Sequence, residues 1–372
     1  MHANHLAAAV ALSLSTAVAA QEAPQPAFFV GTGAGSSIAR VDGYDAGGKA
    51  LASILPYNSF TGGVRVATGD VNGDGLADLV TGAGPGGGPH VKVFDGSTGT
   101  ELRSFFAYEA GFVGGVQVAT GDLDGDGRAE VVTGAGAGGG PHVRVFSGAD
   151  GSVRQSFFAF GDGFTGGVSV AVGDFAGDGR ADVIVGAGAG GGGHVRVFDG
   201  LSGDVRADFF AFENGYAGGM SLATGDFLGQ HALFVGAGEG SAPLVRIFAL
   251  DDARLLGSFL AFDPGFTGGV NVGFARLNGR DTLLTGMASR GGTLGLVDVG
   301  TRRNGGGRAD QQGATEFLTP FGPNYVDGLS VAGVAAPVPE PASWALMLTG
   351  FAAAGFGMRR RLQAPAASVN AA

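Results

Sequence analysis

The sequence predicts an all-β protein, a β-propeller of four-stranded blades, and three observations lead to this prediction. The pair Gly62-Gly63 recurs four more times, at steps of 52, 52, 52 and 50 residues, so the chain is built from internal repeats. Each repeat holds four short β-branched or aromatic segments bounded by Gly, Asp or Ser. No helical periodicity interrupts them between residues 28 and 335. Four antiparallel strands in a repeat of about fifty residues are typical of a propeller blade.

The repeat that begins near residue 112 contains the four predicted strands in order. They are the segments GVQVAT, AEVVTGA, HVRVFSG and VRQSFFAF, and turn-forming residues separate each from the next. When the other repeats are aligned with this one, the continuous blades begin near residues 60, 112, 164, 216 and 266.

The two ends of the repeat region complement each other. FFVGTGAG at 28–35 matches the second strand of a repeat, LFVGAGEG, and YVDGLSVAGV at 325–334 matches a first strand, YAGGMSLATG. Residues 28–59 therefore supply strands two to four of a blade, and residues 325–335 supply its first strand. This predicts a closed ring of six blades over residues 28–335, without a free sheet edge at the junction. An open solenoid, the alternative, would not need complementary ends.

The composition limits the classes of function. The formal net charge of −11 argues against a nucleic-acid partner, because few side chains could neutralise phosphates. The chain contains no cysteine, so an exported fold must be stable without disulfides. Hydrophobic residues make up 45% of the chain, which is enough for a sizeable core.

The N-terminus has the features of a secretory signal. An apolar run from Leu6 to Leu14 precedes small residues, which predicts a signal peptide over residues 1–20 and a linker over 21–27. A buried N-terminal helix is the alternative.

The C-terminus contains a candidate membrane segment. Residues 342–358 are apolar and reach the lower length limit of a membrane span, and a cluster of three arginines and a tail over 362–372 follow. Because arginines next to a span stay in the cytoplasm, the repeats are predicted to lie on the other side of the membrane.

An acidic motif lies between the first and second strands of three repeats. Its copies are DVNGDGLAD from Asp70, DLDGDGRAE from Asp122 and DFAGDGRAD from Asp174. Oxygen-bearing side chains occupy positions 1, 3, 5 and 9, and a glycine at position 6 permits a sharp turn that directs alternate residues inward. Calcium prefers roughly six to eight oxygen ligands, so the pattern predicts a calcium loop closed by the acidic residue at position 9. The backbone carbonyl at position 7 offers a further ligand in each copy: Leu76, Arg128 and Arg180.

Two other interpretations of the motif are open. A catalytic pair of carboxylates is disfavoured, because the motif recurs in equivalent loops whereas an active site is usually singular. Asp-Gly turns that bind no metal are the second alternative, and the third copy favours it most because Ala176 replaces the ligand at position 3. The last two repeats have DFLGQHALF from Asp226 and RLNGRDTLL from Arg276, which are two residues shorter and are predicted to bind no ion.

Two further patterns follow the repeat. His90, His142 and His194 each begin a third strand, and neighbouring blades hold them too far apart to share a zinc ion, so a structural role is predicted. The SFFAY and SFFAF segments, such as Phe105-Phe106, place one aromatic ring on each face of the fourth strand. Packing between blades is predicted for them, with an exposed aromatic rail for sugars as the alternative.

The segment GFVGGVQVATGDLDGDGRAEVVTGAG resembles the FG-GAP, or VCBS, repeat in its Gly-Phe opening, its calcium loop and its Gly-Ala close, and the likeness extends over most of residues 28–335. Such repeats resemble the propeller head of integrin α chains, where the loops join the first two strands of a blade on one face. Integrins have seven blades, so their partner-binding surface is not carried over. The resemblance implies Ca²⁺ ligands in three sites: Asp70, Asn72, Asp74 and Asp78; Asp122, Asp124, Asp126 and Glu130; and Asp174, Asp178 and Asp182.

Val-Pro-Glu-Pro at 338–341, the apolar segment and the arginine cluster resemble, in this order, the PEP-CTERM sorting signal of exopolysaccharide-producing Gram-negative bacteria. The resemblance assigns residues 336–361 to that signal and implies an exosortase-type processing enzyme as a partner. Cleavage near the motif would remove the membrane segment, as in GPI anchoring, and a retained anchor is the alternative.

These features together predict an exported, calcium-stabilised propeller at the cell surface, in the outer envelope or in the extracellular matrix. It is predicted to act as a binding, adhesion or structural module, with exopolysaccharide or a surface protein as its partner. The alternative is a secreted polysaccharide-active enzyme, a lyase or hydrolase, on a propeller scaffold. No nucleophile–base pair stands out in the sequence, which favours the binding module.

Overall fold

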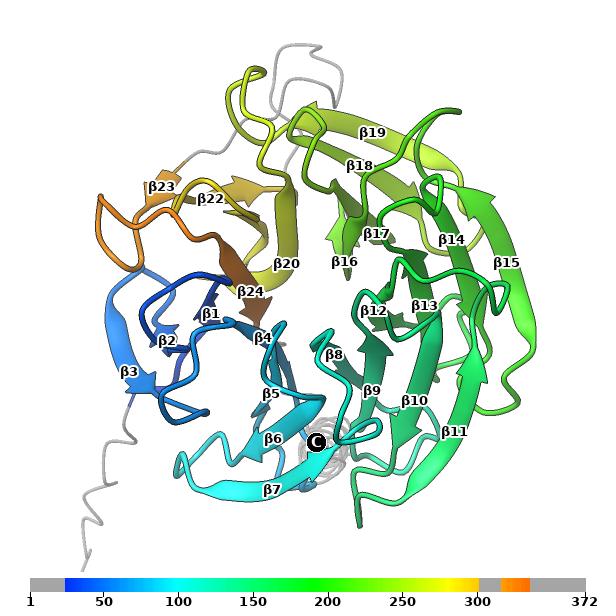
Figure 1. Ribbon diagram of the computed structural model, residues 1–372, viewed down its shortest axis with the longest axis horizontal. Helices are drawn as coiled ribbons and strands as arrows, with labels where there is room; N and C mark the ends of the chain where they lie inside the picture. Colours follow the sequence, from blue (N-terminus) through cyan, green and yellow to red (C-terminus); the bar gives the residue numbers. More distant parts are fainter. Residues whose placement is uncertain (1–23, 301–315, 335–372) are drawn as a thin grey trace, which may run out of the picture.

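Six four-stranded antiparallel sheets are arranged around a ring (Figure 1). The structure is a computed structural model and describes residues 24–300 and 316–334. In these ranges all the regular elements are strands. The predicted all-β fold, a six-bladed propeller, is confirmed.

Five blades are continuous in sequence, and in each the first strand lies nearest the centre of the ring. Their strands are β4 (Val64–Gly69), β5 (Asp78–Ala83), β6 (His90–Phe94) and β7 (Glu101–Phe106); β8 (Val116–Gly121), β9 (Glu130–Ala135), β10 (His142–Phe146) and β11 (Val153–Phe158); β12 (Val168–Gly173), β13 (Asp182–Ala187), β14 (His194–Phe198) and β15 (Val205–Phe210); β16 (Met220–Phe227), β17 (Gln230–Ala237), β18 (Leu244–Ala249) and β19 (Leu255–Leu260); and β20 (Val270–Leu277), β21 (Arg280–Met287), β22 (Leu294–Asp298) and β23 (Glu316–Leu318).

The sixth blade joins the two ends of the repeat region, as predicted. Its strand order is β24-β1-β2-β3, where β1 is Phe28–Thr32, β2 is Val41–Tyr44, β3 is Ala50–Ile54 and β24 is Leu329–Gly333. β24 pairs antiparallel with β1, with Val30 opposite Val331, and Figure 1 shows this strand beside the N-terminal blade. The composite blade closes the ring, because the unpaired edge of β1 is covered by β24.

The burial of each strand follows its place in the blade. In the first three continuous blades the second strand is buried along its whole length, which explains its run of apolar and small residues. The fourth strands expose alternate residues, because one of their faces meets solvent. The pattern of apolar residues therefore changes across a blade, from a continuous run in the second strand to an alternation with exposed residues in the fourth.

The core lies between neighbouring blades. In one such layer, Val80 and Val91 of one blade pack with Val118 and Phe146 of the next. A buried valine contributes about 1.5 to 3 kcal/mol relative to an exposed one, so each pair of blades is held mainly by apolar contact. Tyr108 adds polar bonds across the same junction, because its hydroxyl lies 3.0 Å from the carbonyl of Thr133 and 2.9 Å from that of His142.

The fourth and fifth continuous blades replace the acidic loop with a tight hairpin. Their first two strands extend to eight residues each and are joined by Leu228-Gly229 and by Asn278-Gly279. All four of these turn residues have positive φ, which is the two-residue turn geometry that matches strand twist. The shortened motif therefore forms a two-residue turn in both blades, and the absence of ion binding there stays a prediction.

Several predicted segments lie outside the described residues. They are the signal peptide over 1–20, the sorting signal over 336–361 with its apolar segment 342–358, and the tail over 362–372. Within residues 24–300 and 316–334, no helix has the length and apolar character needed to cross a membrane.

Candidate metal centre

The three acidic loops share one backbone arrangement. The Asp at position 1 accepts hydrogen bonds from the backbone N–H groups at positions 4, 5 and 6, so it ties the loop together. The glycine at position 6 has a φ of 87°, 85° and 85° in Gly75, Gly127 and Gly179, a conformation that strains any side chain. This sharp turn is the one that the motif predicts.

The acidic residue at position 9 is buried in each loop. Asp78 accepts hydrogen bonds from the backbone N–H groups of Val71, Asn72 and Gly96 at 2.9, 3.0 and 3.0 Å. Burial raises the pKa of the Asp78, Glu130 and Asp182 carboxyl groups, because it disfavours their charged form. A bound cation would offset that cost.

The first loop gathers three carboxylates around the amide of Asn72. Its Nδ2 lies 3.0 Å from Asp74 Oδ2, 3.4 Å from Asp78 Oδ1 and 3.2 Å from Asp95 Oδ2. Asp95 follows β6 and is held by Ser97 and Thr98, whose hydrogen bonds lower its pKa to about 2. In the described residues no lysine or arginine forms an ion pair with these carboxylates. The guanidinium of Arg128 lies against this loop, but it donates to the backbone carbonyl of Asn72 and pairs with none of these three carboxylates.

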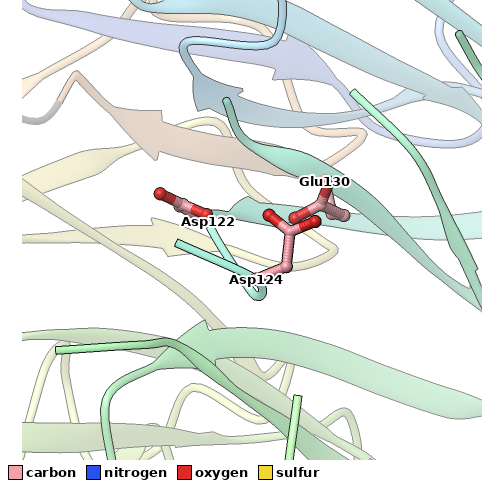
Figure 2. A group of neighbouring side chains, drawn as sticks. All are labelled: Asp122, Asp124 and Glu130. Atoms are coloured by element: carbon pink, nitrogen blue, oxygen red, sulfur yellow. The ribbon is translucent and has the colours of Figure 1, made fainter. Parts of the chain in front are cut away.

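The second loop brings three carboxylates together. Oxygens of Asp122, Asp124 and Glu130 lie within 4.8 Å of one another, and Figure 2 shows the carboxyl groups of Asp124 and Glu130 facing each other. Arg154 of β11 donates a hydrogen bond to Asp124, and its Nε lies 3.8 Å from Glu130 Oε1. That hydrogen bond lowers the pKa of Asp124. A guanidinium thus already balances part of the charge of this cluster.

The third loop has fewer candidate ligands, and its arginine contacts more carboxylates. Ala176 leaves position 3 without an oxygen. Arg206 of β15 contacts three carboxylates: its Nε lies 2.9 Å from Asp182 Oδ1, its NH2 nitrogen lies 3.6 Å from Asp178 Oδ2, and it pairs with Asp199. Of the three loops, this one has the least need of a metal ion.

The arginines reach the loops because of a β-bulge. In every continuous blade from β4 to β19, the pairing of the third and fourth strands skips one residue near the start of the fourth strand. The skipped residue is Leu102, Arg154, Arg206 or Leu256. A bulge redirects the side chain of its extra residue, and here it lies next to the acidic loop of its blade where that loop exists.

Sequence reasoning missed Arg154, Arg206, Asp95 and Asp199 as members of these sites. They lie outside the nine-residue motif, and only pairing within the blade brings them to it. A signal was present in the repeat, because Leu102, Arg154 and Arg206 are spaced 52 residues apart.

The residues at position 7 of the loops contact the carboxylate at position 5. Leu76, Arg128 and Arg180 donate their backbone N–H to it, at 2.8, 2.8 and 3.0 Å. Their assignment as carbonyl ligands stays a prediction.

Backbone hydrogen bonds also link each acidic loop to the acidic loop of the neighbouring blade. The backbone N–H of Ala129 donates to the carbonyl of Asp70 at 2.6 Å, and that of Ala181 donates to the carbonyl of Asp122 at 3.0 Å. Position 8 of one loop is thus attached to position 1 of the preceding loop. An ion that orders one loop would therefore also restrain the next.

The donor set of the first loop fits calcium. Three carboxylate oxygens already surround one point at Asn72, and rotating that amide by half a turn would replace its nitrogen with a fourth oxygen. Oxygen donors from aspartate and asparagine are those that Ca²⁺ prefers. Among the described residues, three carboxylate oxygens lie within 4.8 Å of one another only in the second loop, where Arg154 lies beside them, and the third loop supplies the poorest set.

The histidines do not form a metal site in the described part of the chain. His90 and His142 lie 2.7 and 2.8 Å from the hydroxyls of Ser104 and Ser156, and His194 lies 2.5 Å from Asp208. Each therefore bonds to the fourth strand of its own blade, in agreement with the structural role predicted for it.

The aromatic pairs of the fourth strand divide between two environments. Phe105 is partly buried against Phe146 of the next blade, with ring centroids 4.7 Å apart, as predicted. Phe106 points to solvent instead, so packing between blades accounts for only one ring of each pair.

Comparison with protein families agrees with this geometry. A model described as FG-GAP-like repeat matches residues 70–133 and 122–185, which include all three acidic loops. The chain carries two FG-GAP-like repeats. A PEP-CTERM protein-sorting motif matches residues 337–361, which lie outside the described residues. This motif marks the chain for export and membrane-associated sorting by exosortase-type machinery.

Three solved structures illustrate the similarity to other proteins. U3-55K is 16% identical over 76% of this chain and 78% of its own, with a TM-score of 0.45. An Agrocybe aegerita lectin that recognises non-reducing terminal N-acetylglucosamine is 17% identical over 81% and 80%, with a TM-score of 0.44. A Bacteroides caccae protein of unknown function is 13% identical over 85% and 100%, with a TM-score of 0.46. Such low values do not bear on what this chain binds.

A search of curated proteins found no match to the sequence.

Proposed function

We propose that this chain is an exported, calcium-stabilised propeller of the cell surface or extracellular matrix, and that it binds a repetitive polymer. The exopolysaccharide of the producing cell is the first candidate. One observation carries the proposal: an aromatic surface feature recurs in three successive blades. Phe106, Phe158 and Phe210 end equivalent fourth strands and are 53%, 56% and 62% exposed.

Each exposed phenylalanine rests on a histidine of the neighbouring third strand. The ring centroids are 5.0 Å apart for His90 and Phe106, 5.0 Å for His142 and Phe158, and 4.7 Å for His194 and Phe210. The histidine limits the rotation of the phenylalanine, so a flat apolar surface is held ready for a ligand. Preorganisation of this kind lowers the entropy cost of binding.

Polar groups lie beside these aromatic surfaces. A cavity of about 560 Å³ is lined by Tyr57, His90, Lys92 and Glu101 among others, and a smaller one of about 180 Å³ by equivalent groups of the next blade, including His142. Aromatic walls with a few charged groups are typical of small-ligand sites. Because the feature repeats from blade to blade, it suits a ligand that itself repeats.

Calcium has an architectural role in this proposal. The loops would hold the ion with the side-chain oxygens of Asp70, Asn72, Asp74, Asp78 and their equivalents, and the ion would supply positive charge that offsets burial and repulsion of the carboxylates. Extracellular calcium at about millimolar concentration is sufficient for weak sites of this kind.

The PEP-CTERM motif supports the proposed location. A chain sorted through the membrane by exosortase-type machinery reaches the exterior, where calcium and exopolysaccharide are both available. The signal peptide over 1–20 and the apolar segment over 342–358 remain predictions.

Retention on the polymer tests this function. The full chain is passed over immobilised exopolysaccharide of the producing cell in calcium, and the length of the polymer is measured afterwards. We expect retention without shortening, and at least tenfold weaker retention for a Phe106→Ser, Phe158→Ser, Phe210→Ser variant. Val113→Ser with Val326→Ser, which alters two exposed residues elsewhere, is the matched control. Shortening of the polymer would support the enzyme alternative, and absence of retention would contradict the proposal.

A further inference from the structure

The innermost strands place one polar side chain from each blade into the centre of the propeller. These six residues occupy the second position of β4, β8, β12, β16, β20 and β24, and they line a cavity of about 110 Å³. They are Arg65, Gln117, Ser169, Ser221, Asn271 and Ser330. Arg65 is the one charged member of this ring, and none of the residues that line the cavity is acidic.

Four members of the ring already have hydrogen-bond partners. Ser221 donates to the carbonyl of Val270 at 2.8 Å, and Asn271 donates to that of Leu329 at 2.7 Å. Ser330 accepts from the N–H of Val66 at 3.2 Å, and the hydroxyl of Ser169 lies 3.3 Å from the carbonyl of Gly186. Three of these bonds connect neighbouring blades and that of Ser169 lies within its own blade, so the four residues are accounted for by the fold.

Arg65 and Gln117 differ from the other four. Among the described residues, neither side chain has a hydrogen-bond partner, and Arg65 has no ion pair. Burial lowers the pKa of the Arg65 guanidinium, because protein surrounds it on the axis of the ring. The Arg65 side chain is half-buried, so its guanidinium stays open to the cavity, and proteins normally pair a partly desolvated cation with a counter-charge.

We propose that the axial cavity is an anion site, and that Arg65 with Gln117 binds a small carboxylate or another small oxyanion there. The guanidinium presents a planar set of donors that matches a carboxylate, and the amide of Gln117 on the adjacent blade supplies a further donor. The volume of the cavity equals that of about four waters, which admits an anion the size of formate or acetate. This site is independent of the calcium loops and of the outer aromatic surface.

Thermal unfolding of the full chain with added anion tests the site. Sodium formate or acetate replaces sodium fluoride at constant ionic strength, for the wild type, Arg65→Met and the control Arg254→Met. Arg254 is an exposed arginine that pairs with Asp252, so its replacement removes the same charge outside the cavity. We expect a saturable rise in Tm of about 5 °C in the wild type and control, and no rise in Arg65→Met.

Each outcome decides the proposal. An equal rise in all three proteins would indicate a general salt effect and would overturn the anion site, as would absence of a rise in the wild type. Without anion, Arg65→Met is expected to have a Tm close to that of the wild type, because the half-buried guanidinium that it removes has no partner to lose. If Arg65→Met does not fold, crystals of the wild-type chain grown with bromide provide a second test. An anomalous peak beside Arg65 supports the proposal, and an axial cavity without one contradicts it.

Discussion

The first acidic loop and the two that follow it have the same backbone and different charge balance. In all three loops the Asp at position 1 accepts hydrogen bonds from the same backbone N–H groups, and the acidic residue at position 9 is buried. Around the first loop, Asp95 adds a carboxylate and Leu102 occupies the bulge. Around the second and third, Arg154 and Arg206 occupy that bulge and pair with the loop.

This difference shows how a repeat can keep a loop while its dependence on metal changes. A guanidinium at the bulge supplies positive charge from within the chain, so the loop can fold without an ion. The first loop has no arginine at its bulge, and Arg128 contacts only its backbone, so we expect this loop to depend most on a cation from solution. The fourth and fifth continuous blades complete the series, because their loops are replaced by two-residue turns. We therefore expect calcium dependence to decrease along the chain.

The largest expected effect is on calcium stabilisation when position 5 is changed. Asp74→Asn, Asp126→Asn and Asp178→Asn remove a charge at the same place in each loop while keeping the acceptor for the N–H at position 7. At calcium about 100 times above its Kd, one site contributes about 2.7 kcal/mol, or roughly 5 °C in Tm. We expect Asp74→Asn to lose most of this, Asp126→Asn less and Asp178→Asn least.

The same proteins, measured with a calcium chelator, are the internal control for this series. Without calcium, the three variants should unfold within about 1 kcal/mol of the wild type, because the side chains are exposed, asparagine keeps the acceptor for the N–H at position 7, and an exposed ion pair such as Arg206–Asp178 contributes little. Equal losses at all three positions would show that the arginines do not matter. A wild-type Tm that does not change with calcium would remove the proposed calcium role from all three loops.

Exchanging the residues at the bulge tests the comparison more directly and has a smaller effect. Leu102→Arg supplies the first loop with a competing cation, and Arg154→Met removes it from the second. We expect about tenfold weaker calcium binding in the first case and tighter binding in the second, measured by calorimetry. A tenfold change corresponds to about 1.4 kcal/mol.

Leu256→Arg is the matched control for that exchange. Leu256 occupies the equivalent bulge of a blade whose acidic loop has been replaced by a hairpin. The Leu256→Arg variant adds the same charge to the molecule as Leu102→Arg does. Because its blade has no acidic loop, it should leave calcium binding unchanged. If it weakens binding as much as Leu102→Arg does, the effect comes from net charge and not from the position of the guanidinium.

The sequence predicts the fold almost completely, because each blade is a local unit. Strand order, the buried second strand and the composite blade follow from repeat spacing and from the match between residues 28–35 and 233–240. The turn at position 6 is equally local, because a glycine determines it. Short motifs therefore predict well the parts of the structure that a few consecutive residues specify.

The charge balance of the loops is less accessible from the sequence. Arg154 reaches Asp124 from a strand 30 residues further along, and it does so because a bulge redirects its side chain. Motif spacing contains no information about that bulge. The axial position of Arg65 likewise depends on ring closure, since only the arrangement of six first strands makes the second residue of β4 face the axis.

The smallest expected effect is a pH dependence of the calcium-free protein. Burial raises the pKa of Asp78, Glu130 and Asp182, so between the ordinary carboxyl pKa and the raised value the folded chain binds more protons than the unfolded chain. Stability without calcium should therefore decrease as pH rises through that interval.

Two carboxyl groups act in the opposite direction at lower pH. The lowered pKa of Asp95 and Asp124 provides stability that is complete above their ordinary pKa and is lost as pH falls through the lowered value. Calcium requires ionised carboxylates, so the gain in stability on adding calcium should grow as pH rises through the upper interval. Urea unfolding from about pH 2 to pH 7, with and without calcium, measures the slopes in both the lower and the upper interval. If the calcium-free protein instead gains stability across the upper interval, the buried carboxylates are already neutralised by groups within the chain, and the first loop does not depend on a cation from solution.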